Sequence, residues 1–404
     1  MKIYYPLFFL FFFIYCSHDN DSSDDTLQKG EDPETIDEVF INNYLTESTS
    51  YLSFSGGLLT SFSTLTTGET LPYEFRDVKS VKIIYKTVDT DNNPITASGV
   101  IILPEEPGNY ELVSVQHGTI NSDENAPSHS ALGFNEFTLG AIIAGTGFIS
   151  ILPDYIGYGA SNTIRHPYEH QKSLAQSVSD MILASKEYLR QEDIEYSNTI
   201  SLVGYSEGGF ATLSAFKKLE TESIIPINKV ISGAGAYNKT RFAKSLLASD
   251  EELPFIGHYL WVLDVYNSLY PNLNRPWSAY LNEPYATQIT NYGEINTTLP
   301  NSIFDTTNPK NLFLSSFLSG IVEETDTPFL DALKDNDVHD WTPKAPIHLF
   351  HGTKDELILP FISESTAETL NANGGTVIYT PIEDKDHRGA IIPFFVNSLS
   401  ILNQ

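Results

Sequence analysis

The segment Leu202-Val203-Gly204-Tyr205-Ser206-Glu207-Gly208-Gly209 joins an apolar strand pattern at Thr199–Val203 to a helical pattern at Gly208–Glu220. A serine at a sharp turn between a strand and a helix is typical of a nucleophile held on a strained backbone. The flanking glycines leave out side chains that would collide where strand and helix pass close together. The segment therefore predicts Ser206 as a nucleophile. The alternative is a tight glycine turn with no chemical role.

A serine hydroxyl is a poor nucleophile at neutral pH, so it needs a general base, and that base needs an acid to orient it. Where this turn occurs, the acid follows a late strand and the histidine follows the next strand. Ile347–Phe350 is a strand pattern followed by Asp355, and Thr376–Thr380 is a strand pattern followed by His387. We therefore predict that His387 is the base and that Asp355 orients it.

Other titratable residues near these positions are alternatives. The histidines after Ser206 are His258, His339, His348, His351 and His387. His351 precedes Asp355 too closely in the chain to be its partner across the site, so we expect it to be structural. The acids that adjoin the predicted base but follow no strand of their own are Glu383, Asp384 and Asp386. Asp337-Val338-His339-Asp340 resembles a metal cluster without a second group of ligands, and we expect it at the cap edge.

A serine that attacks a carbonyl group also needs two backbone N–H groups to stabilise the negative charge that develops on the carbonyl oxygen. The first is predicted at Glu207, the residue after the nucleophile. The second is predicted at Thr119, because the segment Val115-Gln116-His117-Gly118-Thr119 carries the His-Gly pair that often follows the third strand of such folds. Ile120 is the alternative for this second N–H group, and a plain strand-end turn is the alternative interpretation of the segment.

Strand and helix patterns alternate around these motifs and predict an α/β fold, with a mostly parallel sheet of about eight strands covered by helices on both faces. The predicted strands are Val78–Val88, Ile95–Leu103, Leu112–Gln116, Phe148–Leu152, Thr199–Val203, Lys229–Ser232, Ile347–Phe350 and Thr376–Thr380. The first two should form an antiparallel hairpin. The predicted helices are Asn135–Ala144, Tyr168–Arg190, Gly208–Glu220, Phe361–Leu370 and Ile391–Leu402. Pro33 to Thr67 has a weak pattern, with a short helix predicted near Ile36–Tyr44.

The alternation stops between Tyr237 and Pro343. This stretch contains all three tryptophans and is rich in tyrosine and phenylalanine. A solvated loop would not carry so many aromatic side chains, so residues 238–343 are predicted to be a packed, mainly helical insertion. Its position between two sheet strands favours a cap over an active site. Residues 35–237 and 344–404 are then the core.

The N-terminal residues have the pattern of an export signal. Lys2 precedes an apolar run, Ile3–Tyr15, that is too short for a membrane span of about 20 residues and typical of a signal peptide, predicted at residues 1–15. Cys16 is the only cysteine, which excludes intramolecular disulfides. The segment resembles a bacterial lipoprotein signal, which implies lipid attachment at Cys16, although Tyr15 is larger than the residue usual there. Residues 16–34 are predicted to be a disordered acidic tether.

The charge balance constrains the partners. The chain has 52 acidic and 23 basic residues and a formal net charge of −29. Such a surface repels nucleic acid and anionic membranes, so membrane contact is expected only through an N-terminal lipid anchor. We expect an outer-membrane or cell-surface lipoprotein, and the alternative is a secreted or periplasmic protein.

These motifs together resemble the secretory lipase family, which includes the capped lipase A type of yeasts and many bacterial esterases. The resemblance covers about residues 70 to 404. It rests on the Ser206 segment, on Leu152-Pro153-Asp154-Tyr155-Ile156-Gly157-Tyr158-Gly159, on Trp341-Thr342-Pro343-Lys344-Ala345-Pro346, and on the Asp355 and His387 segments. It implies an α/β-hydrolase fold, small-molecule or lipid ester substrates, and no metal or organic cofactor. A serine peptidase or acyltransferase, and a non-catalytic binding protein of the same fold, are the alternatives.

Overall fold

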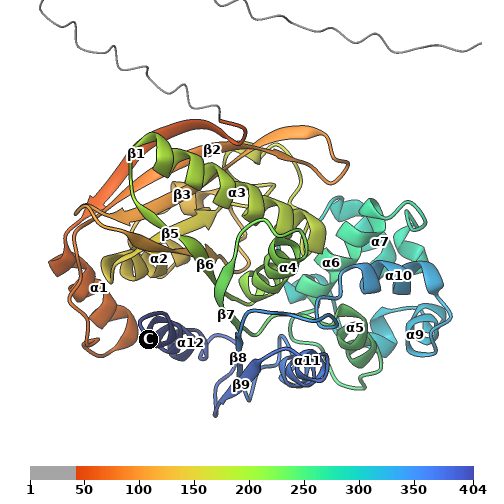
Figure 1. The fold of residues 1–404 in the computed structure, drawn as a ribbon. Helices are drawn as coiled ribbons and strands as arrows, with labels where there is room; N and C mark the ends of the chain where they lie inside the picture. Colours follow the sequence, from red (N-terminus) through yellow and green to blue (C-terminus); the bar gives the residue numbers. More distant parts are fainter. Residues whose placement is uncertain (1–41) are drawn as a thin grey trace, which may run out of the picture. The chain divides into compact units, whose positions relative to one another are not determined.

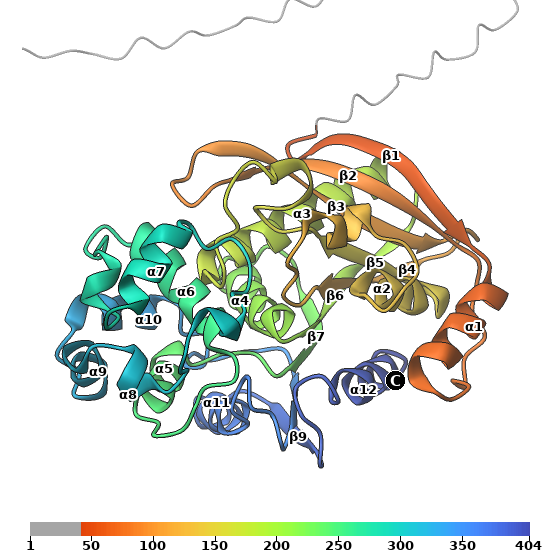
Figure 2. The same ribbon diagram turned by 180° about the vertical axis from the view of Figure 1, so that it is seen from behind.

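The computed structural model describes residues 42–404 (Figures 1 and 2). The predictions for the signal peptide, Cys16 and the tether lie outside the described residues. One sheet of nine strands runs through the described part in the order β1-β2-β3-β5-β4-β6-β7-β8-β9. Its strands are β1 (Leu45–Phe54), β2 (Val78–Val88), β3 (Pro94–Pro104), β4 (Tyr110–Gln116), β5 (Phe148–Pro153), β6 (Tyr196–Tyr205), β7 (Ile227–Gly233), β8 (Ile347–Gly352) and β9 (Val377–Ile382).

The sheet has nine strands where about eight were predicted, because β1 adds one at its edge. β1 pairs antiparallel with β2, and most of its side chains are at least partly exposed, so it lacks the apolar alternation that marks a strand. A contact distant in sequence fixes where it starts. The buried carboxylate of Glu187 accepts hydrogen bonds from the N–H groups of Tyr44 and Leu45, at 2.9 and 2.7 Å.

The remaining strands match the predicted arrangement. β2 and β3 form the expected antiparallel hairpin, and β3 pairs antiparallel with β5. From β5 through β4, β6, β7 and β8 to β9, every neighbouring pair is parallel. The carboxyl ends of these parallel strands therefore lie at one edge of the sheet, where the loops that carry the predicted site residues begin.

Helices cover both faces of the sheet. The helices of the core are α1 (Gly56–Thr67), α2 (Glu136–Gly145), α3 (Gln171–Gln191), α4 (Glu207–Thr221), α11 (Phe361–Ala372) and α12 (Ile391–Leu402). Neighbouring side chains of β3 pack on opposite faces, with Ile101 in the core beneath α3 and α4 and Val100 in the core beneath α2 and α12. Parallel strands buried on both faces explain why their sequences are almost continuously apolar.

Two helices differ from the prediction. α1 was not predicted, since its sequence, Gly-Gly-Leu-Leu-Thr-Ser-Phe-Ser-Thr-Leu-Thr-Thr, is rich in residues that are neutral or unfavourable in helices. α3 begins at Gln171, three residues after the predicted start at Tyr168. Tyr168 and Glu169 consequently lie in a loop before the helix, where both line a cavity beside Ser206.

The predicted helical cap is present between β7 and β8 (Figures 1 and 2). It contains α5 (Lys239–Leu247), α6 (Ile256–Leu269), α7 (Tyr285–Tyr292), α8 (Pro309–Leu312), α9 (Ser315–Val322) and α10 (Thr327–Asp335). Large aromatic side chains fill its interior, including the fully buried Trp261, Tyr266 and Tyr280. Within residues 42–404, no helix combines the length and the apolar character needed to cross a membrane.

Candidate active site

Ser206 lies on a strained turn between β6 and α4. Its φ of 61° and ψ of −124° are angles that a residue with a side chain rarely adopts. The two glycines are required by close approach, as predicted. A Cβ atom on Gly204 would lie 2.2 Å from the carbonyl oxygen of Gly208, and one on Gly208 would lie 2.2 Å from that of Gln116. The tight packing holds the serine at the tip of the turn, at the N-terminus of α4.

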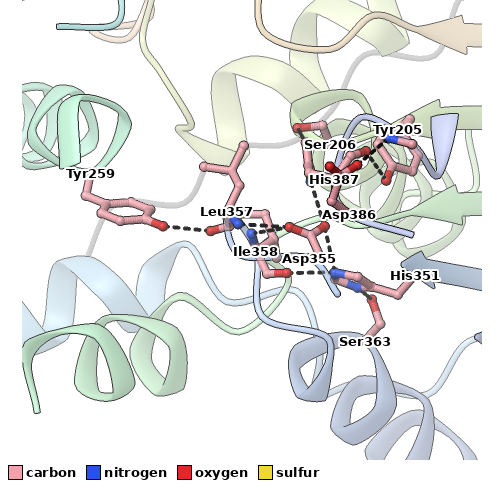
Figure 3. A network of polar contacts seen from close by, with 11 residues as sticks. Tyr205, Ser206, Tyr259, His351, Asp355, Leu357, Ile358, Ser363, Asp386 and His387 are labelled. Atoms are coloured by element: carbon pink, nitrogen blue, oxygen red, sulfur yellow. Dashed lines mark hydrogen bonds and ion pairs between the residues drawn. The ribbon is translucent and has the colours of Figure 1, made fainter. Parts of the chain in front are cut away.

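The structure brings the three predicted residues of the triad together (Figure 3). Nε2 of His387 lies 2.8 Å from Oγ of Ser206, and Nδ1 of the same ring lies 2.6 Å from Oδ2 of Asp355. Asp355 follows β8 and His387 follows β9, so adjacent parallel strands place the acid beside the base. An unbroken hydrogen-bond chain therefore links the serine to a buried carboxylate.

The acids offered as alternatives to Asp355 are exposed and have other roles. Asp384 forms an ion pair with Lys354 at 2.8 Å. Asp386 accepts a hydrogen bond from the N–H of Gly389 at 2.7 Å. Among these acids, only Asp355 accepts a hydrogen bond from His387 within residues 42–404.

Four donors surround the Asp355 carboxylate. Oδ1 accepts from the backbone N–H groups of Leu357 and Ile358, at 2.9 and 3.0 Å. Oδ2 accepts from His387 and from Nε2 of His351, which lies 3.1 Å away. Burial raises the pKa of Asp355, but the hydrogen bonds from His351 and His387 outweigh burial and lower this pKa to about 2. The carboxylate is therefore charged throughout the neutral range.

The contact between His351 and Asp355 was not anticipated from the sequence, which suggested only a structural role. Nε2 of His351 also lies 2.8 Å from the carbonyl oxygen of Ile358. Because both neighbours of this nitrogen are acceptors, it carries the proton. Nδ1 then accepts from the hydroxyl of Ser363 at 2.6 Å (Figure 3). The ring is buried and its tautomer is set by these partners. The spacing of four residues between His351 and Asp355, across the turn after β8, is the signal that would have revealed the contact.

Two backbone N–H groups near the serine are candidates for the oxyanion site. The N–H groups of Thr119 and Glu207 have no acceptor among the hydrogen bonds of the described residues. The neighbouring N–H of Gly118 is already used, because it donates to Oε1 of Glu136 at 2.9 Å. Thr119, and not the alternative Ile120, lines a cavity together with Ser206. The geometry thus leaves the two predicted N–H groups free to bind a substrate oxygen.

The Pro-Asp-Tyr segment after β5 supports the loop that carries Thr119. Tyr155, with a φ of 65°, donates its hydroxyl to the carbonyl of His117 at 3.1 Å, and Tyr158 donates to that of Ile120 at 2.8 Å. Nε2 of His117 lies 3.0 Å from the carbonyl oxygen of Asp154. These hydrogen bonds hold the loop from both sides. The Pro-Asp-Tyr motif, which was noted in the sequence only because it resembles the family, therefore has a structural role.

The side chain of Glu207 forms a second polar pair that was not predicted. Its Oε1 lies 2.8 Å from Nε2 of His166, and both side chains are buried. Nδ1 of His166 lies 2.7 Å from the carbonyl of Ile156 and must donate to it. The pair therefore ties the first turn of α4 to the segment after β5, next to the candidate oxyanion site.

Two cavities of different character meet at Ser206. The first, of about 90 Å³, lies under the cap and is lined mainly by aliphatic and aromatic side chains, among them Leu246, Leu263 and Phe317. The second, of about 330 Å³, is more polar and includes the residues Asn121, Glu136, Asp386 and Arg388. Ser206, His258 and Leu357 line both cavities. The serine thus lies where an apolar chamber meets a more polar cavity.

The Asp337-Val338-His339-Asp340 segment lies at the base of the cap. The carboxylate of Asp337 accepts from the N–H of Thr240 at 3.1 Å and from its hydroxyl at 2.7 Å, which fixes the start of α5. No group of three or more potential metal ligands occurs within residues 42–404. The contacts of Asp337 link the two ends of the cap, the start of α5 and the segment after α10.

The mostly parallel sheet, the serine on the strained turn after β6 and the helical insertion define an α/β-hydrolase with a cap. The chain belongs to the secretory lipase family, whose model matches residues 130–393, and it is a carboxylic-ester hydrolase. The matched segment includes Ser206, Asp355 and His387. The family's description as secretory points to export. No curated protein sequence matches the chain significantly.

Three solved structures illustrate how widely this fold is shared. A protein of Legionella pneumophila assigned as a hydrolase is 24% identical, with a TM-score of 0.78, covering 89% of this chain and 98% of its own. The rice cell wall degrading esterase LipA of Xanthomonas oryzae is 18% identical, with a TM-score of 0.74, covering 89% and 97%. Lipase A of Candida antarctica is 17% identical, with a TM-score of 0.62, covering 86% and 78%. At these identities the likeness shows the fold.

Proposed function

We propose that the protein is an exported serine hydrolase that cleaves carboxylic esters through a covalent acyl-enzyme on Ser206. One observation carries the proposal: Ser206, His387 and Asp355 form a continuous hydrogen-bond chain, with the serine on a strained turn at the junction of two cavities. This is the arrangement that raises the reactivity of a serine hydroxyl at neutral pH.

In the first step Oγ of Ser206 attacks the ester carbonyl while Nε2 of His387 takes its proton. The N–H groups of Thr119 and Glu207 stabilise the negative charge on the carbonyl oxygen. The carbon–oxygen bond to the alcohol then breaks, and His387 returns the proton to the leaving alcohol. In the second step water attacks the acyl-enzyme, with His387 as base, and releases the acid and the free serine.

Asp355 and His351 prepare the base for these steps. Asp355 accepts from Nδ1 of His387, which keeps the lone pair on Nε2 directed at Ser206, and its charge stabilises the imidazolium that forms. His351 donates to the same carboxylate oxygen and is held by Ser363 and by the carbonyl of Ile358. We assign His351 as a positioning residue that keeps Asp355 charged and correctly oriented.

The two cavities suggest how an ester is oriented. The apolar chamber under the cap suits the acyl group, since burial of apolar surface supplies most of the binding free energy there. The larger, more polar cavity suits the alcohol part, because His387, which must protonate the leaving oxygen, lines this cavity. Residues 238–343, which supply most of the chamber's walls, are therefore proposed as the cap that sets acyl preference.

The decisive experiment combines Ser206→Ala with a fluorophosphonate probe and a substrate panel. The probe should label the wild type and not the variant, and short- to long-chain esters should be hydrolysed only by the wild type. Ser316→Ala, an exposed serine in α9, is the matched control and should behave as wild type. Unlabelled wild type would indicate a binding protein, and faster cleavage of an aminoacyl amide than of any ester would indicate a peptidase. Full ester hydrolysis by Ser206→Ala would overturn the proposal.

We propose further that residues 1–15 are removed as a signal peptide and that Cys16 is acylated, with residues 16–34 as a tether. The pattern of apolar run, cysteine and acidic segment supports this. Expression in a Gram-negative host with a radiolabelled fatty acid should label the wild type and leave Cys16→Ala unlabelled. Unlabelled wild type in the periplasm or medium would instead support plain secretion.

A further inference from the structure

The apolar chamber beneath the cap contains one buried ion pair. Glu169 and Lys239 are the only residues with formally charged side chains among those that line it, and the others are mostly aliphatic or aromatic. Only 6% of Glu169 and 4% of Lys239 is exposed. Such a pair is unexpected in a chamber whose other walls suit a hydrocarbon chain, because removing two charges from water is costly.

The pair comes from two different parts of the fold. Glu169 lies in the loop before α3, beside Tyr168, whose hydroxyl is 2.9 Å from Oγ1 of Thr119. Lys239 is the first residue of α5, at the root of the cap. The carbonyl of Glu169 also accepts from the hydroxyl of Tyr266 on α6, at 3.0 Å. The loop is therefore anchored to the cap by its backbone as well as by the ion pair.

The pair has hydrogen-bonding capacity that the chain itself does not use. The side-chain ammonium group of Lys239 has three N–H donors. Among the described residues, the only acceptor that it contacts is Oε2 of Glu169. The ammonium group also lies 4.0 Å from the centre of the Phe210 ring. Oε1 of Glu169 has no donor among the hydrogen bonds of residues 42–404. Burial raises the pKa of Glu169, only partly offset by Lys239, so the carboxylate is incompletely stabilised by its surroundings.

A hydroxyl group fits this unused capacity best. It can accept a hydrogen bond from Lys239 and donate one to Glu169 at the same time. A carboxylate would be repelled by Glu169, and a carbonyl could use only the lysine. We infer that the chamber selects esters whose acyl group carries a hydroxyl on an otherwise apolar chain, which hydrogen-bonds to the Glu169–Lys239 pair. This inference rests on the proposed function of Ser206.

If the Glu169–Lys239 pair had only a structural role, a different result would be expected. An ion pair that only joins the cap to the core can be replaced by uncharged side chains of similar shape with a change in stability alone, and the order of substrate preference stays the same. A pair that binds a substrate hydroxyl changes the preference between hydroxylated and plain acyl chains. The ratio of two kcat/KM values therefore separates the roles.

The experiment compares methyl octanoate with its analogues that carry a hydroxyl at carbon 3, 7 or 8, positions at which the ester does not readily form a lactone. In the wild type, kcat/KM for the best hydroxylated ester should exceed that for methyl octanoate by about tenfold, as expected for one hydrogen bond to a charged group. In Glu169→Gln/Lys239→Met the ratio should fall to about one. The control, Arg275→Met/Asp326→Asn, removes a partly buried ion pair of the cap that does not line the chamber and should keep the wild-type ratio.

Two outcomes would overturn the inference: a wild type that prefers plain octanoate over every hydroxylated analogue, or a double variant that keeps the wild-type ratio. Should the double variant fail to fold, calorimetry with Ser206→Ala decides, since that protein should bind the best hydroxylated ester about tenfold more tightly than methyl octanoate. Equal affinities would reject the inference. Hydrolysis that depends on Ser206 but ignores the hydroxyl refutes only this inference, whereas hydrolysis by Ser206→Ala refutes the proposed function.

Discussion

The loops of the core and the chamber of the cap differ in how they are built. The core presents Ser206, His387 and Asp355 from three turns at the ends of parallel strands, each side chain fixed by hydrogen bonds. The chamber beneath the cap is lined mainly by apolar side chains, most of them from helices of the cap, with the Glu169–Lys239 pair as a polar exception. We propose that polar geometry in the core determines the reaction and that apolar shape in the cap determines which acyl group reaches it. Substitutions in the core should lower the rate of hydrolysis of every ester by a similar factor. Substitutions in the cap should lower it for some esters and not for others.

The largest effect is expected in the core. His387→Ala should lower kcat for all esters by about 10⁵- to 10⁶-fold, because the serine loses its base. Ser206→Ala/His387→Ala should be no slower than either single variant, since the residues act as one unit. Steady-state hydrolysis of a short and a long ester measures this. Losses that add up in the double variant, or that differ between the two esters, would contradict the separation of core and cap.

His351 provides a finer test of the core. His351→Leu removes a donor from Asp355 and leaves the Ser363 hydroxyl without its acceptor, so kcat should fall by roughly 100-fold for every ester. His351→Gln keeps an N–H donor and should recover much of this loss. The pH dependence of stability between about pH 2 and 4 should also change in His351→Leu, since the pKa of Asp355 rises towards its ordinary value when the donor is lost. If the pH dependence of the stability of His351→Leu were the same as that of the wild type, or if both variants lost the same factor in kcat, His351 would have only a structural role.

The charge on Asp355 should make stability depend on pH in the acid range. Its pKa is lowered from 3.8 to about 2 in the folded protein, so the carboxylate contributes stability above pH 4 that is lost as the pH falls towards 2. The contribution is about 2 kcal/mol. Urea unfolding at a series of pH values should show the difference between wild type and Asp355→Asn shrinking over this window. The exposed Asp384→Asn is the control, and a constant difference for Asp355→Asn would reject the linkage.

The smallest expected effect lies in the cap and discriminates among substrates. Ala243→Phe places a ring in the apolar chamber, so kcat/KM for a long-chain ester should fall by about tenfold while that for an acetate ester stays within about twofold. Ala372→Phe, on the exposed surface of α11, is the control and should change neither. Equal losses for long and short esters would mean that the chamber does not bind the acyl chain.

The central strands and the Ser206 turn were predicted well from the sequence because they depend on interactions between residues close together in the chain or in adjacent strands. The strands β4 to β9 are short, apolar and bounded by turn residues, and the hairpin of β2 and β3 follows from its turn. The motif around Ser206 could be recognised because the close contacts that require glycine are nearby. A Cβ atom on Gly204 would collide with the backbone of Gly208, and one on Gly208 would collide with Gln116 in the adjacent strand. The elements that were missed, β1 and α1, lack a periodic apolar face. β1 is held instead by Glu187, a residue far away in the chain.

The amino-acid sequence by itself determined the class of fold, the family and three residues that the structure brings within hydrogen-bonding distance. Strand order and short motifs suffice for this, because parallel strands carry their loops to one edge of the sheet. Only the tertiary structure decided which groups surround those residues. The pairing of Glu207 with His166 and the Glu169–Lys239 pair in the chamber both arise from the packing of separate elements. Their spacing in the sequence specifies no distance in space, and so their chemistry emerges only when the elements pack together.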